Sequence, residues 1–426
     1  MFSSSRLIGT MTAAAAVCIP APFAVAGVTT VTTLVAEGDL IRGIGVVTSV
    51  DAIAVNNNGS WLVEVDTNHP DTEADVLVLR DGVLFAREGQ SLDAPPGATL
   101  GSFDSVNLNN AGHIGWNLFL DGLAGNEDSG IFFNLDLVTQ EGTSPTAPGL
   151  SLETLFIGFF EARINDGNST FVIASVDDPA IPSSVDQVAI WFHQDPESGE
   201  VSQSLLYAEG DLIPDTGEAV TSFGTGPENI AINSSGSALI VAALTGDSAT
   251  NAAIVLDDTL VARKGDIAPG TGLAQNISTS TRVDLNDRGD IVYRTNLSGG
   301  PTATNQVIIR NGETFVQKGD DAPGVEGERI IEGFGTGPTL IDNDGEVIWY
   351  AELSGDNATD QVLYRGDTII LQKGVTTVDG RTLTTIGGTT ATGNITEGFA
   401  VSDNGRYIVV RAVLDGDTTA AILVDL

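Results

Sequence analysis

The chain has 426 residues, of which 57 are Asp or Glu and only 18 are Lys or Arg, so its formal net charge is −39. This charge excludes nucleic acid and anionic membrane surfaces as partners, because a phosphate-rich partner requires a basic patch. The length would suit two average domains, but repeat arrays and large all-β folds of this size often form one.

The first 26 residues have the composition of a secretory signal peptide. Arg6 is followed by an Ala-rich apolar run, and Ala24-Val25-Ala26 has the small-residue pattern of a signal-peptidase site. Cleavage there would also remove Cys18, the only cysteine, so the mature chain would contain no disulfide. The alternative is lipid acylation of Cys18, but the residues before it lack the Leu and the small final residue of such a site.

No later segment has the ~18 consecutive apolar residues of a membrane span. We therefore predict a secreted protein, extracellular or at the cell surface. Its single domain would cover residues 27–426.

A hairpin pattern is repeated along the mature chain. In residues 283–297 two alternating apolar segments flank a turn that ends in Gly289, and a turn rich in Asn, Asp and Gly suits positive φ angles. The unit occurs seven times, with turns at residues 56–59, 109–112, 165–168, 233–236, 286–289, 342–345 and 402–405.

A second marker alternates with these turns. It is a Gly preceded by Glu or Lys, at positions 38, 89, 142, 210, 265, 319 and 374. Two further strand-like segments separate each hairpin from the next marker, so each repeat contains four strands. Seven repeats of four antiparallel strands predict an all-β fold, a seven-bladed β-propeller.

The two ends of the repeat pattern do not match. The last hairpin is followed by a third strand but no fourth, whereas residues 31–36 form an extra strand before the first hairpin. We predict that this N-terminal strand completes the last blade and closes the ring, which removes two open sheet edges.

The innermost strand of a propeller blade borders the central channel. Strand alternation predicts that the residue two before each turn faces this channel, and the seven residues are Ala54, Asn107, Arg163, Ala231, Asp284, Leu340 and Ala400. Arg163, Asp284 and Asn107 are therefore candidate ligand-binding residues, with Glu161 and Arg282 two positions further back. The alternative is that Glu161 and Arg282 only neutralise Arg163 and Asp284 within the scaffold.

Four aspartates directly follow marker glycines. Asp39, Asp211, Asp266 and Asp320 would lie on one face of the ring, where such carboxylates suit calcium. The alternative is that each aspartate caps its own turn. The three histidines are far apart in sequence, and no metal-ligand spacing, catalytic triad or nucleophile elbow is visible.

The hairpin turns and the residues after them resemble a family of secreted bacterial tandem-repeat proteins with an Asn-x-x-Gly-x-x-Ala-Phe consensus, whose members carry different C-terminal surface anchors. Asn and Gly match in most copies, whereas Ala-Phe is replaced by Gly115-Trp116, Val292-Tyr293 or Ile348-Trp349. The resemblance implies an extracellular bacterial protein, and it brings no catalytic residue with it.

These observations predict a monomeric, non-enzymatic binding module for an extracellular glycan or protein. One alternative is a polysaccharide-active hydrolase or lyase with carboxylates and Arg163 at the channel mouth. Another is a purely structural cell-surface repeat protein.

Overall fold

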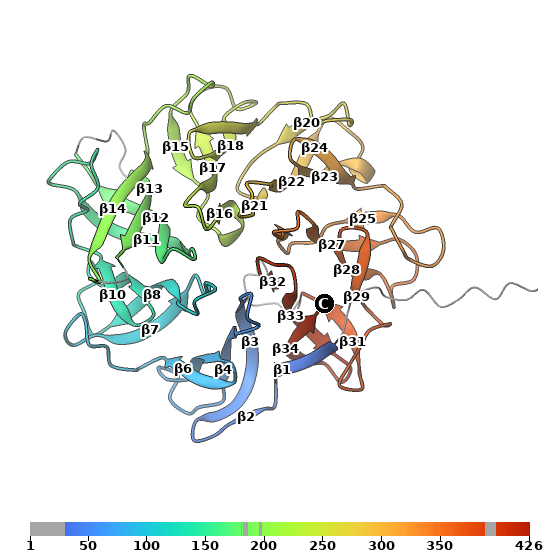
Figure 1. Cartoon of the computed structure of the whole chain (residues 1–426), viewed down its shortest axis with the longest axis horizontal. Helices are drawn as coiled ribbons and strands as arrows, with labels where there is room; N and C mark the ends of the chain where they lie inside the picture. Colours follow the sequence, from blue (N-terminus) through green and yellow to red (C-terminus); the bar gives the residue numbers. More distant parts are fainter. Residues whose placement is uncertain (1–29, 180, 182–185, 196–197, 388–397) are drawn as a thin grey trace, which may run out of the picture.

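The computed structural model describes residues 30–179, 181, 186–195, 198–387 and 398–426, so the predicted signal peptide lies outside the described residues. Small antiparallel sheets are arranged as seven blades around a central channel (Figure 1). The prediction of a seven-bladed β-propeller is confirmed. The described helical segments are two short 3-10 turns, η1 (Pro227–Asn229) and η2 (Thr302–Thr304).

The blades follow one another in chain order. Blade one contains β2 (Leu40–Ile41), β3 (Gly45–Val55), β4 (Trp61–Thr67), β5 (Val76–Arg80) and β6 (Val83–Arg87). Blade two contains β7 (Thr99–Asp104), β8 (Gly115–Asp121), β9 (Ser129–Phe133) and β10 (Asp136–Gln140). Blade three contains β11 (Leu155–Ile164), β12 (Ser169–Asp177), β13 (Asp186–Gln194) and β14 (Val201–Ala208).

In the remaining four blades the innermost strand consists of two segments. Blade four contains β15 (Val220–Phe223), β16 (Ile230–Ile232), β17 (Ala238–Leu244), β18 (Ala252–Leu256) and β19 (Thr259–Arg263). Blade five contains β20 (Ala274–Asn276), β21 (Arg282–Leu285), β22 (Ile291–Ser298), β23 (Gln306–Arg310) and β24 (Glu313–Gln317). Blade six contains β25 (Ile331–Gly333), β26 (Thr339–Ile341), β27 (Val347–Leu353), β28 (Gln361–Arg365) and β29 (Thr368–Gln372). Blade seven contains β30 (Thr377–Val378), β31 (Arg381–Ile386), β32 (Phe399–Val401), β33 (Tyr407–Leu414), β34 (Thr418–Asp425) and β1 (Thr30–Ala36).

The innermost strand is longer than the hairpin pattern predicted. In blades four to seven it is split into two segments that pair with the same neighbour, as β15 and β16 both pair with β17. In blade four the loop between the segments contains Pro227, which has no N–H to donate to a sheet ladder. The split brings a loop, η1 in blade four, into the wall of the channel.

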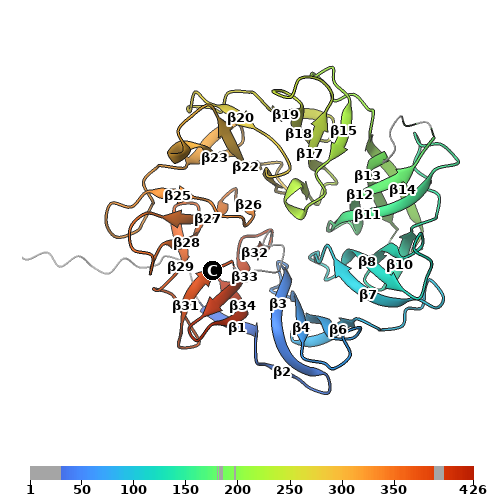
Figure 2. The same ribbon diagram turned by 180° about the vertical axis from the view of Figure 1, so that it is seen from behind.

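The ring is closed by the N-terminal strand. β1 pairs antiparallel with β34, from Thr30 opposite Asp425 to Ala36 opposite Ala420, and it forms the outer edge of blade seven (Figure 2). The buried side chains of Val35 and Ala36 add to the apolar contacts of this pairing. The prediction of closure by residues 31–36 is confirmed.

The first residue of the hairpin turn links neighbouring blades in blades one to five. In blade two, Asn109 Oδ1 accepts a hydrogen bond from the backbone N–H of His113 in its own turn, at 2.8 Å. Its Nδ2 donates to the carbonyl of Asn165 in the next turn, at 3.0 Å. An Asn side chain can do both because its amide carries one acceptor and two donors.

The same donation repeats through the first five blades, from the turn of blade one to that of blade six. We call its residues the asparagine belt: Asn56, Asn109, Asn165, Asn233 and Asn286. Blade six has Asp342 at this position, and there the N–H of Asn343 donates to the carbonyl of Asp403 instead. The N–H of Asn404 then donates to Asn57 Oδ1 at 2.8 Å, which connects blade seven to blade one.

The glycines of both markers have positive φ. Gly289 in a hairpin turn has φ +82°, and Gly265 at a second marker has φ +92°. The N–H of Gly265 donates to the carbonyl of Gln275 in the next blade, at 2.9 Å. Asn168, which replaces glycine in the third turn, has φ +58°, a conformation that Asn tolerates better than most residues.

Candidate functional site

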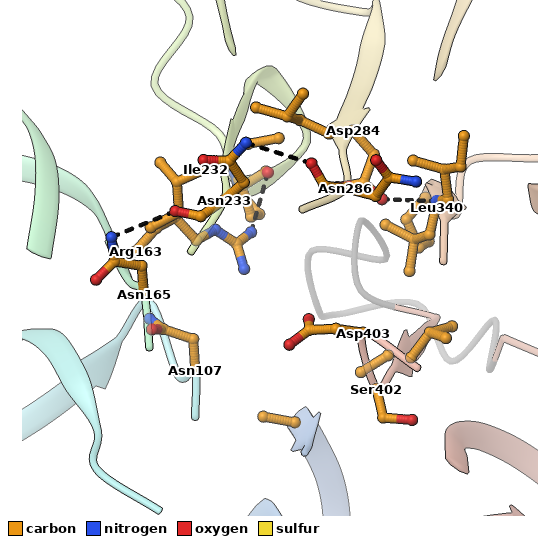
Figure 3. Close-up of a pocket in the computed structure, with 18 of the residues that line it drawn as sticks. Asn107, Arg163, Asn165, Ile232, Asn233, Asp284, Asn286, Leu340, Ser402 and Asp403 are labelled. Carbon is orange, nitrogen blue, oxygen red and sulfur yellow. Dashed lines mark hydrogen bonds between the residues drawn. The ribbon is translucent and has the colours of Figure 1, made fainter. Parts of the chain in front are cut away.

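The turns and inner strands of all seven blades surround a cavity of about 240 Å³ in the channel. Figure 3 shows part of its lining around a common central space. Each of the seven residues that strand alternation placed at the channel lines this cavity: Ala54, Asn107, Arg163, Ala231, Asp284, Leu340 and Ala400.

Arg163 is held on the blade-three side of the cavity. Its Nε lies 3.0 Å from Glu161 Oε1, and its Nη2 donates to the carbonyl of Pro227 in blade four at 2.9 Å. The Glu161 side chain is 2% exposed, whereas that of Arg163 is 26% exposed. Glu161 is therefore a buried counter-ion, and Arg163 is the member of the pair that reaches solvent.

Asp284 lies on blade five, and its Oδ2 accepts a hydrogen bond from the backbone N–H of Ile341 in blade six at 2.7 Å. Burial raises the pKa of this carboxyl to about 7, against the smaller opposing effects of its backbone hydrogen bonds and of Arg163. At neutral pH the carboxyl is thus present in both protonation states. It can donate a hydrogen bond as well as accept one.

Asn107 has a structural function. Its Nδ2 donates to the carbonyls of Gly115 and Ala162 at 2.6 and 2.8 Å, and its Oδ1 accepts from the N–H of Ile164 at 2.9 Å. The side chain therefore joins blades two and three. A ligand would have to compete with these bonds to use the amide.

Arg282 forms its ion pair with a residue of another blade. The contacts given for its guanidinium among the described residues are with Glu228 and Thr336, and not with Asp284, which the sequence analysis considered as its partner. Its Nη1 lies 2.9 Å from Glu228 Oε1 on η1, and its Nη2 donates to the carbonyl of Thr336 at 3.3 Å. Arg282 and Glu228 both line the cavity. The loop that splits the inner strand of blade four supplies the glutamate, which the hairpin pattern could not locate.

Three further carboxylates line the cavity where the turns meet, and the sequence analysis did not single them out. Asp166, Asp287 and Asp403 each occupy the second position of a hairpin turn. Asn110 Nδ2 donates to both Asp166 and Asp403, at 2.7 Å each. Burial, with smaller contributions from the charges of Asp287 and Asp166, raises the pKa of Asp403 to about 6, against the opposing effect of the hydrogen bond from Asn110. Comparing the second turn positions across the repeats could have revealed this acidic rim.

The four aspartates predicted as calcium ligands each bind their own turn. Asp39, Asp211, Asp266 and Asp320 use Oδ2 to accept the backbone N–H three residues earlier, at 2.7 to 2.8 Å. Within the described ranges, no group of three or more His, Cys, Asp or Glu residues is placed to hold a metal ion. The structure therefore does not bring these aspartates together, and calcium binding stays a prediction.

The chain belongs to a protein family described as a family of unknown function, DUF7453. The family pattern matches residues 9–260 and, again, residues 204–420. The second match overlaps the first, as expected for a chain built from internal repeats. No curated protein matches the sequence.

Several solved structures are similar in fold. The polysaccharide lyase Uly1 has a TM-score of 0.42 and 11% identity, over 92% of this chain and 91% of that one. A protein of unknown function from Dyadobacter fermentans has a TM-score of 0.34 and 10% identity, over 94% of this chain and 100% of its own. The Trypanosoma rangeli sialidase has a TM-score of 0.32 and 8% identity, and the chain spans 58% of its length. Identities this low concern the fold alone.

In the part of the chain that the structure describes, no helix is long and apolar enough to cross a membrane.

Proposed function

We propose that this protein is a secreted, non-enzymatic binding module that recognises an extracellular glycan in the channel cavity. The observation that carries the proposal is the lining of that cavity, where Arg163 and Asp284 present a guanidinium and a carboxyl from different blades. Arg163 can only donate hydrogen bonds, whereas Asp284 can donate and accept. Sugar hydroxyls do both, so they suit such a lining.

The size of the cavity limits what it can take. At about 240 Å³ it is below the ~300–1,000 Å³ that drug-sized ligands occupy. It therefore suits one ring-sized group of a longer ligand, with the rest lying across the turns. A protein partner would have to insert a single side chain, which makes the glycan the better fit.

The test is binding to a panel of purified extracellular polysaccharides. Because Arg163→Ala alone would remove the ion-pair partner of the buried Glu161, the variant used is the double substitution Arg163→Ala with Glu161→Gln. We expect this variant and Asp284→Asn to lose at least about tenfold in affinity, with melting temperatures within a few degrees of the wild type. Arg288→Ala is the matched control, because Arg288 is an exposed turn residue outside the cavity lining.

Loss of stability with affinity retained would assign Arg163 and Asp284 to the scaffold. Absence of binding to the whole panel would contradict the glycan proposal. It would then favour a structural repeat protein or a protein-binding module.

One observation keeps a polysaccharide-active enzyme as a second candidate. A carboxyl with a pKa of about 7, such as that of Asp284, suits a general acid at neutral pH. Incubation with the bound polysaccharide, followed by assays of new reducing ends and of unsaturated products, distinguishes the two. Product formation that Asp284→Asn abolishes would establish the enzyme.

A further inference from the structure

The lining of the cavity contains more carboxyl groups than guanidinium groups. Each of its arginines has a glutamate as ion-pair partner. Arg163 lies 3.0 Å from Glu161, and Arg282 lies 2.9 Å from Glu228. The aspartates of the lining, in contrast, have no ion pair with Lys or Arg among the described residues, and they are Asp166, Asp284, Asp287 and Asp403.

The excess of negative charge remains when the nearest buried arginine is included. On the blade-five wall of the cavity, Arg294 pairs in register with Arg282, but it is not part of the lining. The group then contains three arginines and six carboxyls, those of Glu161, Glu228, Asp166, Asp284, Asp287 and Asp403. A ligand with a positive charge would reduce the repulsion in this group, and one with a negative charge would increase it.

The three carboxylates of the acidic rim are close together and open to a ligand. Asn110 Nδ2 donates to Asp166 Oδ2 and to Asp403 Oδ2 at 2.7 Å each, so these two oxygens lie at most twice that distance apart. Asp166, Asp287 and Asp403 are all exposed to solvent. Their hydrogen-bond donors in the described chain are amides and a hydroxyl, which bring no positive charge.

The carboxyls of the lining also repel one another. After burial, the charges of Asp287 and Asp166 contribute to the raised pKa of Asp403, and the charge of Asp403 contributes to the raised pKa of Asp284. Asp403 thus interacts with each of the other three. Its side chain extends into the central space of the cavity (Figure 3), where a ligand atom could lie among them.

An apolar layer lies next to the acidic rim, and it gives independent information about the ligand. The residue directly before each hairpin turn is aliphatic, and all seven line the cavity: Val55, Leu108, Ile164, Ile232, Leu285, Ile341 and Val401. A bare metal ion would have no use for this layer. A group with apolar surface and a positive charge at its edge would contact both layers.

We propose that the acidic rim binds a protonated amino group through Asp403 and Asp166, so that the glycan recognised by this cavity carries free amino groups. This inference rests on the proposed function. An ammonium group has three N–H donors and no acceptor, which matches carboxylates that only accept. A pyranose ring has C–H faces for the aliphatic layer, and an amino substituent projects from its edge toward the rim.

The experiment uses a matched pair of probes, the glucosamine trimer and its fully N-acetylated form, which share a skeleton and differ in charge. Calorimetric titration of the full chain at about pH 6.5 measures both, because there the amines are protonated and Asp403 is mostly ionised. We expect the amine to bind at least about tenfold more tightly than the acetylated form, with one site per chain.

Two variants and one control complete the test. Asp403→Asn keeps an acceptor for Asn110 and should reduce the preference for the amine at least about threefold, and the double variant Asp403→Asn with Asp166→Asn should abolish it. Neither should change binding of the acetylated trimer. Asp258→Asn, which removes an exposed negative charge outside the cavity lining, should keep the preference.

Equal binding of the two trimers would overturn the amino-group subsite and leave the glycan proposal standing. A preference that the double variant retains would also overturn it, because the overall acidity of the chain would then be the cause. If neither trimer binds, the subsite is overturned and the wider polysaccharide panel decides the proposed function separately. Binding of a lysine oligomer but of neither trimer would assign the rim to a basic side chain of a protein partner.

Discussion

The asparagine belt and the blade-five wall of the cavity are adjacent, yet they satisfy their polar groups in different ways. In the belt, Asn109 and its equivalents use both ends of each amide, one in their own turn and one in the next. In the wall, Arg282 lies opposite a second arginine, and its Nε is without a hydrogen-bond partner among the described residues. The belt repeats around the ring, whereas the wall occurs on one blade.

This difference distinguishes residues that serve the folding of the propeller from residues of the candidate binding site. A position that repeats with all its hydrogen bonds made is explained by folding alone. A position that departs from the repeat and lines the cavity is not explained by the repeat alone, and ligand binding is the explanation that we propose. Asn107 and Asp284 occupy equivalent positions. Asn107 uses both ends of its amide in hydrogen bonds within blades two and three, whereas the ionisable carboxyl of Asp284 accepts one from Ile341 in blade six.

The largest expected effect comes from breaking the scaffold at its closure. Deleting residues 30–36 removes β1 and leaves β34 as an open edge in blade seven. We expect aggregation or loss of the cooperative melting transition, measured by size-exclusion chromatography and calorimetry. A chain that starts at Thr30 is the control, and an unchanged monomeric profile for the deletion would show that the ring is stable without β1.

A smaller effect is expected within the belt. Asn109→Asp keeps the acceptor for the N–H of His113 but replaces the donor to the carbonyl of Asn165 with a second oxygen. We expect a loss of about 1–3 kcal/mol in the free energy of unfolding, measured by urea denaturation. Ser248→Asp, which adds the same charge at an exposed site, is the control. Equal losses of stability in the two variants would show that the added negative charge, and not the lost hydrogen bond, is the cause.

The pH dependence of stability tests the burial of carboxyl groups in the scaffold and in the cavity lining. Burial raises the pKa of Asp284, Glu88 and Glu141 to about 7 and that of Asp403 to about 6. The folded protein then binds more protons than the unfolded chain between pH ~4 and ~7, so stability falls as the pH rises through this window. We expect a melting temperature several degrees higher at pH 5 than at pH 8.

Asp284→Asn removes one of these ionisations and should reduce the slope, chiefly by raising the melting temperature at pH 8. The measurement is calorimetry at constant ionic strength. A melting temperature that rises with pH would contradict the burial of these carboxyls.

The smallest effect is expected at the turn aspartates. Asp266→Asn keeps an acceptor for the N–H of Arg263, so the free energy of unfolding should change by less than about 0.5 kcal/mol. If Asp266 only caps its own turn, calcium should stabilise this variant and the wild type no more than sodium does at matched ionic strength. A calcium-specific rise in melting temperature that Asp266→Asn abolishes would instead establish the metal site.

Local chemistry made most of the fold predictable. Turn residues with positive φ and alternating strands identify the blades, and the unmatched strand at residues 31–36 identifies the closure. Strand alternation also found Arg163 and Asp284 in the cavity. The resemblance to Asn-x-x-Gly-x-x-Ala-Phe repeat proteins stays a prediction.

Contacts between blades were not predictable from the sequence. Arg282 meets Glu228 because a loop splits the inner strand of blade four, and no sequence spacing encodes where that loop lies relative to blade five. The asparagine belt could not be predicted from the sequence for a related reason. An Asn in a turn explains its own local bonds, and its second use appears only when the next blade is in place.

The pairing of β1 with β34 joins the first described strand to the last. Contacts between residues so far apart in the chain form slowly, because a large loop must close before they add stability. During synthesis β1 is made first and must stay unpaired until β34 exists, so blades one to six can assemble before blade seven does. β1 is without its partner throughout that interval, and the time before ring closure is when this chain is most prone to misassembly with a neighbouring copy.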